Sequence, residues 1–159
     1  MAADTLLSSF NFAVQIELSG LGGDEGLALR ARGAFSEVQG LEITLEPVSF
    51  REGGYNLGAR QLVGKTTHPP LILKRGLSLD TAFWTWVNRC LDGTFPLPYV
   101  CGTVRVLPAS GEGATAGVWR FENAIANKVK AADLNAGSGR EVALEELHLV
   151  HEGLRRETP

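Results

Sequence analysis

The chain has 159 residues, of which 44% are hydrophobic and 21% charged, and its formal net charge is −3. This length and ordinary composition fit one folded domain spanning residues 1–159, and they argue against a disordered or fibrous protein. The small, mixed charge offers no basic field for sequence-specific nucleic-acid binding, and no stretch approaches the roughly 20 apolar residues of a membrane span, so membrane insertion is not expected.

The first predicted element is a strand at residues 10–18, where apolar and polar side chains alternate strictly. Alternation of this kind is typical of a half-buried strand. The glycine-rich residues 20–26 then predict a turn. Their spacing superficially matches a phosphate-binding loop, but no helical stripe follows to offer its N-terminus to a pyrophosphate. We therefore reject a dinucleotide site at this turn.

Residues 33–50 predict two short strands around Gln39 and Gly40, and the second strand has Leu41, Ile43 and Leu45 pointing inward. Residues 51–70 are polar and rich in glycine, and no sustained period returns until the apolar run at residues 71–76. We expect a long excursion from the sheet here. Because long loops inside compact domains are usually functional or disordered, residues 50–64 are a candidate assembly loop.

One helix is expected between residues 78 and 93. Ser78 or Asp80 can cap its start, and Gly93 fits just past its end. Trp84 falls beside the apolar stripe and can cover either the flank of the helix or a neighbouring subunit. The stripe that should pack on the sheet consists of Leu79, Phe83, Trp86, Val87 and Cys90.

The remaining chain predicts further strands at residues 99–107, 117–130 and 141–154. The first has valines on one face, the second has a bend after Asn123, and the third changes phase between Glu145 and Glu146, which predicts a bulge or bend. We count seven or eight strands that are joined by turns. The expected fold is therefore mainly β: an antiparallel β-sandwich or rolled β-barrel with one packed α-helix.

A search for chemistry gives no catalytic, metal-binding or cofactor-binding residues. His148 and His151 should lie on opposite faces of a strand, and His68 is expected to be solvated or at an interface. The acidic clusters, which include Glu141 with Glu145 and Glu146, are expected to form a solvated polar face. Cys90 and Cys101 lack a metal or redox spacing, and we expect both to be small core residues. No nucleophile, zinc or phosphate-loop motif occurs.

Several segments in order carry a family resemblance. They are EVQGLEITLEPVSFREGGYN, then LILKRG and WTW, and finally WRFENAIANKVKAADLNAGSGREVALEELHLVHEGL. Together they resemble the conserved pattern of phage tail-tube proteins, and the most similar branch is the inner-tube proteins of extracellular contractile injection systems. The resemblance runs from about residue 10 to residue 154.

This resemblance implies a fold like that of the haemolysin-coregulated protein of type VI secretion. It implies hexameric rings that stack into a hollow tube, with sheath and baseplate proteins as partners and a lumen able to carry cargo. The chain would be assembled in the bacterial cytoplasm and become part of an injection particle or virion. A tube initiator at the baseplate remains an alternative role within the same family.

Ring formation also suits a β-rich chain, because neighbouring subunits would cover exposed strand edges. A monomeric ligand-carrying β-barrel would share the composition but hold a small apolar molecule, and an exported enzyme would need a catalytic set. The expected interface residues combine charge, aromatic area and hydrogen-bonding groups. They are Phe50, Arg51, Glu52, Gly53, Gly54, Tyr55, Asn56 and Arg60.

Overall fold

The computed structural model describes residues 12–18, 35–77, 81–93, 95–107, 117–133 and 143–157. These residues form a mainly antiparallel β structure with one helix, which confirms the predicted fold class. The glycine-rich turn at residues 20–26 lies outside the described residues. The elements are β1 (Phe12–Leu18), β2 (Phe35–Gln39), β3 (Thr44–Phe50), β4 (Arg60–Thr67), β5 (Leu71–Gly76), α1 (Thr81–Asp92), β6 (Val100–Val106), β7 (Gly117–Lys130), β8 (Leu144–Val150) and β9 (Gly153–Glu157).

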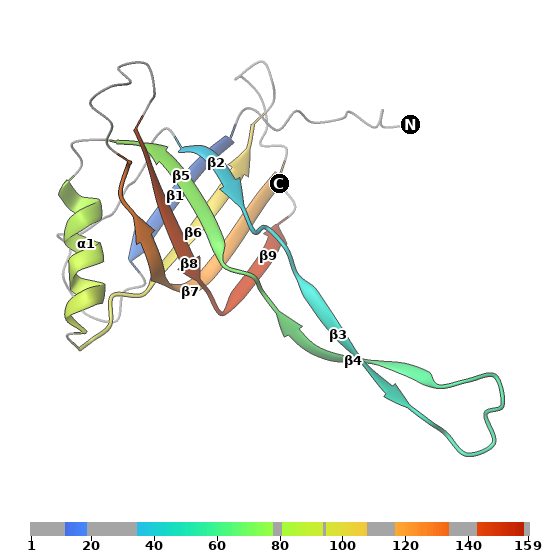
Figure 1. Ribbon diagram of the computed structural model, residues 1–159. Helices are drawn as coiled ribbons and strands as arrows, with labels where there is room; N and C mark the ends of the chain where they lie inside the picture. The colour runs from blue at the N-terminus through green and yellow to red at the C-terminus, as the bar shows by residue number, and fades with distance from the viewer. Residues whose placement is uncertain are drawn as a thin grey trace.

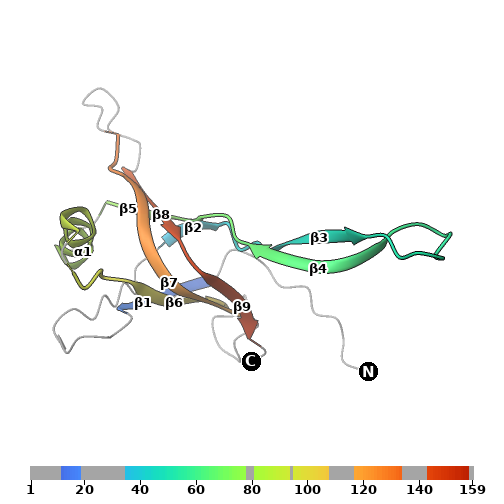
Figure 2. The same cartoon turned by 90° about the horizontal axis from the view of Figure 1, so that it is seen from below.

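The body of the molecule is a folded-over sheet with the strand order β1-β6-β7-β8-β5-β2, in which β9 also pairs with β7. The first half of β7 pairs with β6 and β9, and its second half pairs with β8. Between the halves, Asn123 adopts a positive φ of 50°, at the bend that the sequence predicted. The long strand β7 therefore belongs to both layers of the body and curves from one to the other (Figure 2).

The core lies between these layers because every second residue of the strands points inward. In β6, Val100 and Val104 are buried on the same side as Gly102, as the sequence predicted. A side chain at Gly102 would overlap the ring of Phe121, so the absence of a Cβ lets that ring fill the core. The buried apolar residues are Val14, Ile16, Leu71, Leu73, Phe83, Trp86, Val87, Val100, Val104, Phe121, Ala124, Leu147, Leu149 and Leu154.

Helix α1 lies against one end of the body (Figure 1), and its predicted apolar stripe faces the core. Phe83, Trp86 and Val87 are buried, and Cys90 is partly buried against them. The indole nitrogen of Trp86 donates a hydrogen bond of 2.8 Å to the carbonyl oxygen of Pro98. Burial raises the pKa of the Cys90 thiol, which makes it less reactive. Three further residues of the helix prediction, Ser78, Leu79 and Asp80, lie outside the described residues.

A buried ion pair fixes the same helix to the sheet. Arg75 on β5 stands opposite Glu145 on β8, and Arg75 Nε donates to Glu145 Oε2 over 3.0 Å. The Arg75 guanidinium lies 4.0 Å from the centre of the Phe83 ring, and the Trp84 indole donates to Glu145 Oε1 over 3.3 Å. Trp84 therefore covers the flank of the helix within its own subunit, which is the first of its two predicted roles.

The ion pair corrects two predictions about the last strand. Glu145 is not part of a solvated face, because its exposure is only 2%. The strand β8 also has no phase slip: Glu145, Leu147 and Leu149 point inward in regular alternation, with the carboxylate in a core position. The bulge of this strand pair lies in β7, between Ala126 and Lys128. The sequence pattern predicted a phase slip because a charged residue, Glu145, occupies an inward position where an apolar residue is expected.

Two further predictions about burial were wrong. Ile43 and Leu45 were expected to point inward, but both are exposed, because β3 leaves the body and pairs only with β4. Cys101 was expected in the core, but it lies on the face of β6 opposite the buried valines. Its neighbours in the strand, Val100 and Gly102, occupy the inward positions instead.

Candidate assembly surface

The most prominent feature outside the body is a two-stranded sheet made by β3 and β4, which we call the arm (Figure 1). Residues 51–70 were expected to be an irregular excursion, but residues 60–67 form a strand and residues 51–59 form the tip of a hairpin. This is a correction of the sequence prediction. The arm pairs with no other strand among the described residues, so its strands depend on each other for backbone hydrogen bonds.

Both faces of the arm carry apolar side chains. On one face Val48 stands opposite Leu62, and Phe50 is the next residue of β3 on that side. These three side chains are 51–53% exposed. On the other face, Pro47 stands opposite Val63, which is 84% exposed. Because both faces are apolar, folding one of them onto the body would still leave the other in water.

An isolated two-stranded hairpin is marginally stable in water, and exposed contiguous apolar side chains usually mark an interaction surface. All residues of β3 are exposed, and β4 is exposed except at Gly64. Burying these side chains within the chain would require a third layer, which the described residues do not supply. The geometry of the arm therefore fits a second molecule that covers it.

The tip of the arm is ordered by its own contacts. Arg60 forms an ion pair with Glu52 and places its guanidinium carbon 4.7 Å from the centre of the Tyr55 ring. The backbone N–H of Tyr55 donates to the carbonyl oxygen of Glu52 over 3.2 Å. These contacts are solvent-exposed, so they shape the tip without forming a core.

Of the eight residues that the sequence assigned to an interface, six lie in this tip and two, Phe50 and Arg60, are the strand residues that flank it; all eight are exposed. The structure brings them together, and their role in assembly stays a prediction. Sequence reasoning missed the apolar strand positions Val48, Leu62 and Val63. The signal was available, because two apolar runs that flank a glycine-rich turn are typical of a β-hairpin.

The body offers a second assembly feature in its strand edges. The layer β1-β6-β7-β9 ends at β1 on one side and at β9 on the other, and neither outer edge is paired within the described residues. The other layer ends at β2. Unpaired edges present a row of backbone N–H and C=O groups to which another chain can pair. The body therefore has open edges in addition to the apolar arm.

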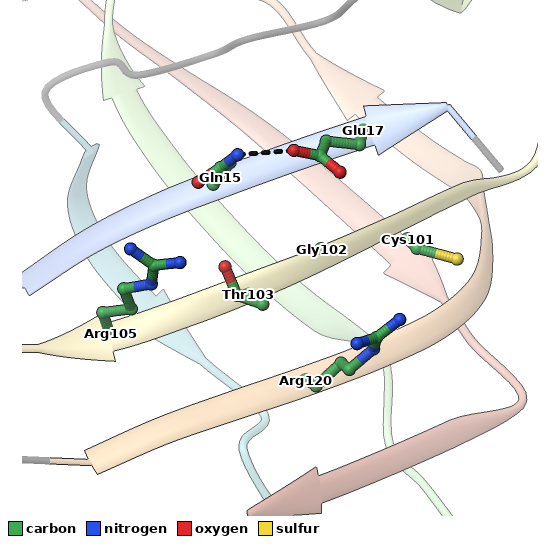
Figure 3. Close-up of a pocket in the computed structure, with 7 residues that line it drawn as sticks. All are labelled: Gln15, Glu17, Cys101, Gly102, Thr103, Arg105 and Arg120. Carbon is green, nitrogen blue, oxygen red and sulfur yellow. Dashed lines mark hydrogen bonds between the residues drawn. The ribbon is translucent and has the colours of Figure 1, made fainter. Parts of the chain in front are cut away.

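A polar hollow lies on the outer face of β1, β6 and β7 (Figure 3). Gln15 Nε2 donates to Glu17 Oε1 over 2.5 Å, and Arg120 lies within 3.4 Å of Glu122. Charges of both signs neutralise one another here, and the hollow contains no nucleophile paired with a base. It is lined by Gln15, Glu17, Cys101, Gly102, Thr103, Arg105 and Arg120.

The histidines are distributed differently from the prediction. His148 lies on β8, 3.6 Å from Glu146, whereas His151 lies in the turn between β8 and β9, so, contrary to the prediction, the two histidines do not share a strand. His68 was expected to be solvated or at an interface; it is half-buried, which argues against full solvation, and its ring centre lies 5.1 Å from that of His151. Among the described residues, no group of three or more histidine, cysteine or acidic residues could hold a metal ion.

The only described helix has 12 residues, and no helix in this part of the chain is long and apolar enough to cross a bilayer.

The sequence of this chain also matches a known protein family. A family model described as the T4-like virus tail tube protein gp19 matches residues 8–155. This match spans most of the chain and includes the body and the arm. A comparison with curated protein sequences gave no match.

Solved structures share the fold. A chain from the baseplate of the anti-feeding prophage is 23% identical, with a TM-score of 0.74 and coverage of 96% of both chains. A chain from the sheath-tube complex of an extracellular contractile injection system, PVC, is 18% identical, with a TM-score of 0.75 and coverage of 99% of this chain and 95% of that chain. A type six secretion system protein has 12% identity and a TM-score of 0.52, covering 92% of this chain and 83% of that one.

Proposed function

This chain belongs to the family of the T4-like virus tail tube protein gp19, and we propose that it is the repeating subunit of the inner tube of a contractile injection system or phage tail. Family membership makes it a structural tube protein rather than an enzyme. In the proposed assembly, six copies form a ring, and rings stack into a hollow conduit for cargo. The fold shared with injection-system proteins is consistent with this role.

The observation that carries the proposal is the arm. Its two strands expose apolar side chains on both faces, including Val48, Leu62 and Val63, and it extends away from the core (Figure 1). In a ring or between stacked rings, a neighbouring copy supplies the missing apolar layer. The polar tip, with Arg51 and Asn56, then meets water or a further copy at the rim of the contact. A monomeric ligand-binding protein has no use for such an arm.

The edges of the body support the same proposal. In a closed ring, the edge of β1 in one subunit faces an edge of the next, so every backbone group along the ring finds a partner. Ring closure uses the same surfaces in each copy and leaves no open end. We propose that the arm and the edges act together, with the edges setting the ring and the arm joining adjacent copies.

The proposal also gives the chain partners in the particle. One similar structure is a sheath-tube complex and another is a baseplate. By analogy, we propose that sheath and baseplate proteins surround tubes of this chain, which would be assembled in the cytoplasm before the particle acts. The domain is proposed to be single, because all layers of the body share one core.

Negative-stain electron microscopy and sedimentation velocity of the purified full chain test the proposal. We expect six-fold rings, or tubes built from them, and a sedimenting species with the mass of six chains or a multiple of it. A protein that remains a monomer at every concentration would reject the tube subunit. A monomer that binds a small apolar molecule would instead support the ligand-carrying barrel.

A further inference from the structure

The arm is attached to the body at two short segments, residues 40–43 and 68–70, which we call the arm root. Gly40 has a φ of 86°, and a Cβ there would overlap the carbonyl oxygen of Pro70, so the two segments touch through their backbones. The N–H of Glu42 donates to the Gly40 carbonyl oxygen over 2.8 Å, which closes a tight turn. The direction of the arm is therefore set where these segments meet the body.

At the root, the ring of His68 packs against the ring of His151, which lies in the turn that follows β8. The two ring centres lie 5.1 Å apart with the planes inclined by 37°. The ring of His151 is also 6.4 Å from that of Phe121, which belongs to the core. The two imidazole rings thus connect residues 68–70, through which the chain returns from the arm to the body, with the turn between β8 and β9.

His151 is poorly placed to hold a positive charge. His68 Nδ1 and His151 Nε2 are buried, and neither has a hydrogen-bond partner among the described residues. Protonation gives the ring a second N–H donor, and burial removes the water that would otherwise solvate the charged form. Two protonated rings would in addition repel each other at this distance.

The groups around the pair offset this cost only in part. On the β8–β9 turn, His151 Nδ1 lies 3.1 Å from the Gly153 carbonyl oxygen, and the Pro69 carbonyl near the ring also favours the protonated form. The neighbouring carboxylate, Glu152, instead accepts a hydrogen bond of 2.9 Å from Asn123 on β7. From β7, the ring that faces His151 is the uncharged Phe121.

We propose that His68 and His151 form an acid-sensitive latch that holds the arm root while His151 is neutral and loosens it when His151 takes up a proton. The proposal does not depend on ring formation, because every contact in it lies within one chain. Its consequence for an assembled particle is that acid would change the angle or the mobility of the arm. The device therefore couples pH to the surface that joins subunits.

The direction of the effect follows from the pKa of His151. Burial lowers this pKa below its ordinary value of 6.5, and the charge of His68 lowers it further. The unfolded chain therefore binds the proton more readily than the folded chain. The contribution of the latch to stability is complete above pH 6.5 and is lost as the pH falls from 6.5 through the lowered folded pKa.

An NMR titration of the histidine Cε1 protons in the full chain tests the latch directly. We expect the midpoint of His151 to lie below 6.5, and the variant His68→Gln should move it upward toward that value. His148→Gln is the matched control, because His148 contacts Glu146 and not the pair. A midpoint of His151 at or above 6.5 in the unmodified chain would overturn the proposal, even if the variant failed to fold.

Hydrogen exchange measures the loosening itself. On acidification, and after correction for the intrinsic pH dependence of exchange, amides at residues 66–68, 71–72 and 151–154 should lose protection while those of β6 keep theirs. The loss should be smaller in His68→Gln and unchanged in His148→Gln. Equal changes in the root and in β6, or the same loss in all three proteins, would mean that the pair is only a packing contact.

Discussion

The body and the arm are both antiparallel β structure, yet apolar side chains are buried in the body and exposed in the arm. Val104 in β6 is 2% exposed, whereas Val63 in β4 is 84% exposed. In the body, two layers and a helix cover the inward faces; in the arm, both faces look outward. The comparison teaches that a strand pattern reports local geometry, while burial depends on which layer, or which molecule, lies opposite.

The difference also separates the residues that stabilise the monomer from those that we propose to act in assembly. Full burial of a valine side chain contributes about 1.5–3 kcal/mol, so the monomer gains its stability from body residues such as Val104. Exposed arm residues such as Val63 contribute little to the stability of the monomer. Matched substitutions in the two regions should therefore have unequal effects on monomer unfolding, which is measured in urea at concentrations where the chain is monomeric.

The largest expected effect comes from Trp86→Ala. Trp86 is fully buried and its indole N–H is bonded to Pro98, so truncation leaves a large cavity and should lower the free energy of unfolding by about 3–5 kcal/mol. The matched arm change, Leu57→Ala, should stay within about 0.5 kcal/mol because Leu57 is 89% exposed. Similar losses in both variants would contradict the division between body and arm.

Two acidic residues give the second comparison. Glu145→Ala removes the buried carboxylate that accepts from Arg75 and should cost about 3–5 kcal/mol, since removing one partner of a buried ion pair is strongly destabilising. Glu52→Ala breaks the exposed pair with Arg60, which should cost about 0–1 kcal/mol. Circular dichroism during urea unfolding measures both. A tolerated Glu145→Ala would show that the Arg75 position is open to water.

Two glycines give the third and smallest comparison. An added methyl at Gly102 would meet the Phe121 ring and the Gln15 carbonyl oxygen, so Gly102→Ala should overpack the core and cost about 1–3 kcal/mol. At Gly53, no atom lies within 4 Å of the added methyl, and Gly53→Ala should be nearly neutral. Thermal melting of the two variants side by side checks this. A neutral Gly102→Ala would mean that β6 and β7 can separate at that point.

The sequence predicted the body far better than the arm. Alternation located the strands that contain Ile16, Val104 and Phe121, and the spacing of Phe83, Trp86 and Val87 located the helix. Each of these patterns reflects a layer that belongs to the same chain. Family motifs predicted the tail-tube fold, which the family match and the shared fold of solved structures confirm.

The errors have a common physical cause. Leu45 alternates like a core residue, which predicts an inward position, but no layer among the described residues covers it. Glu145 was read as solvated because a charge is rarely buried, and its partner Arg75 lies 70 residues away in sequence. His68 and His151 are even farther apart in sequence. Pairings across such separations are set by the fold and leave no local pattern.

The central claim is that a neighbouring copy covers the apolar faces of the arm. The double variant Val48→Ser, Leu62→Ser tests it by sedimentation velocity, with Gln61→Ser, Lys65→Ser as a control at exposed polar positions of the same strand. We predict that the first variant keeps the circular dichroism of the monomer but no longer forms rings or tubes, whereas the control assembles normally. Normal assembly of Val48→Ser, Leu62→Ser would contradict the account, because the arm would then be exposed in the assembled particle as well.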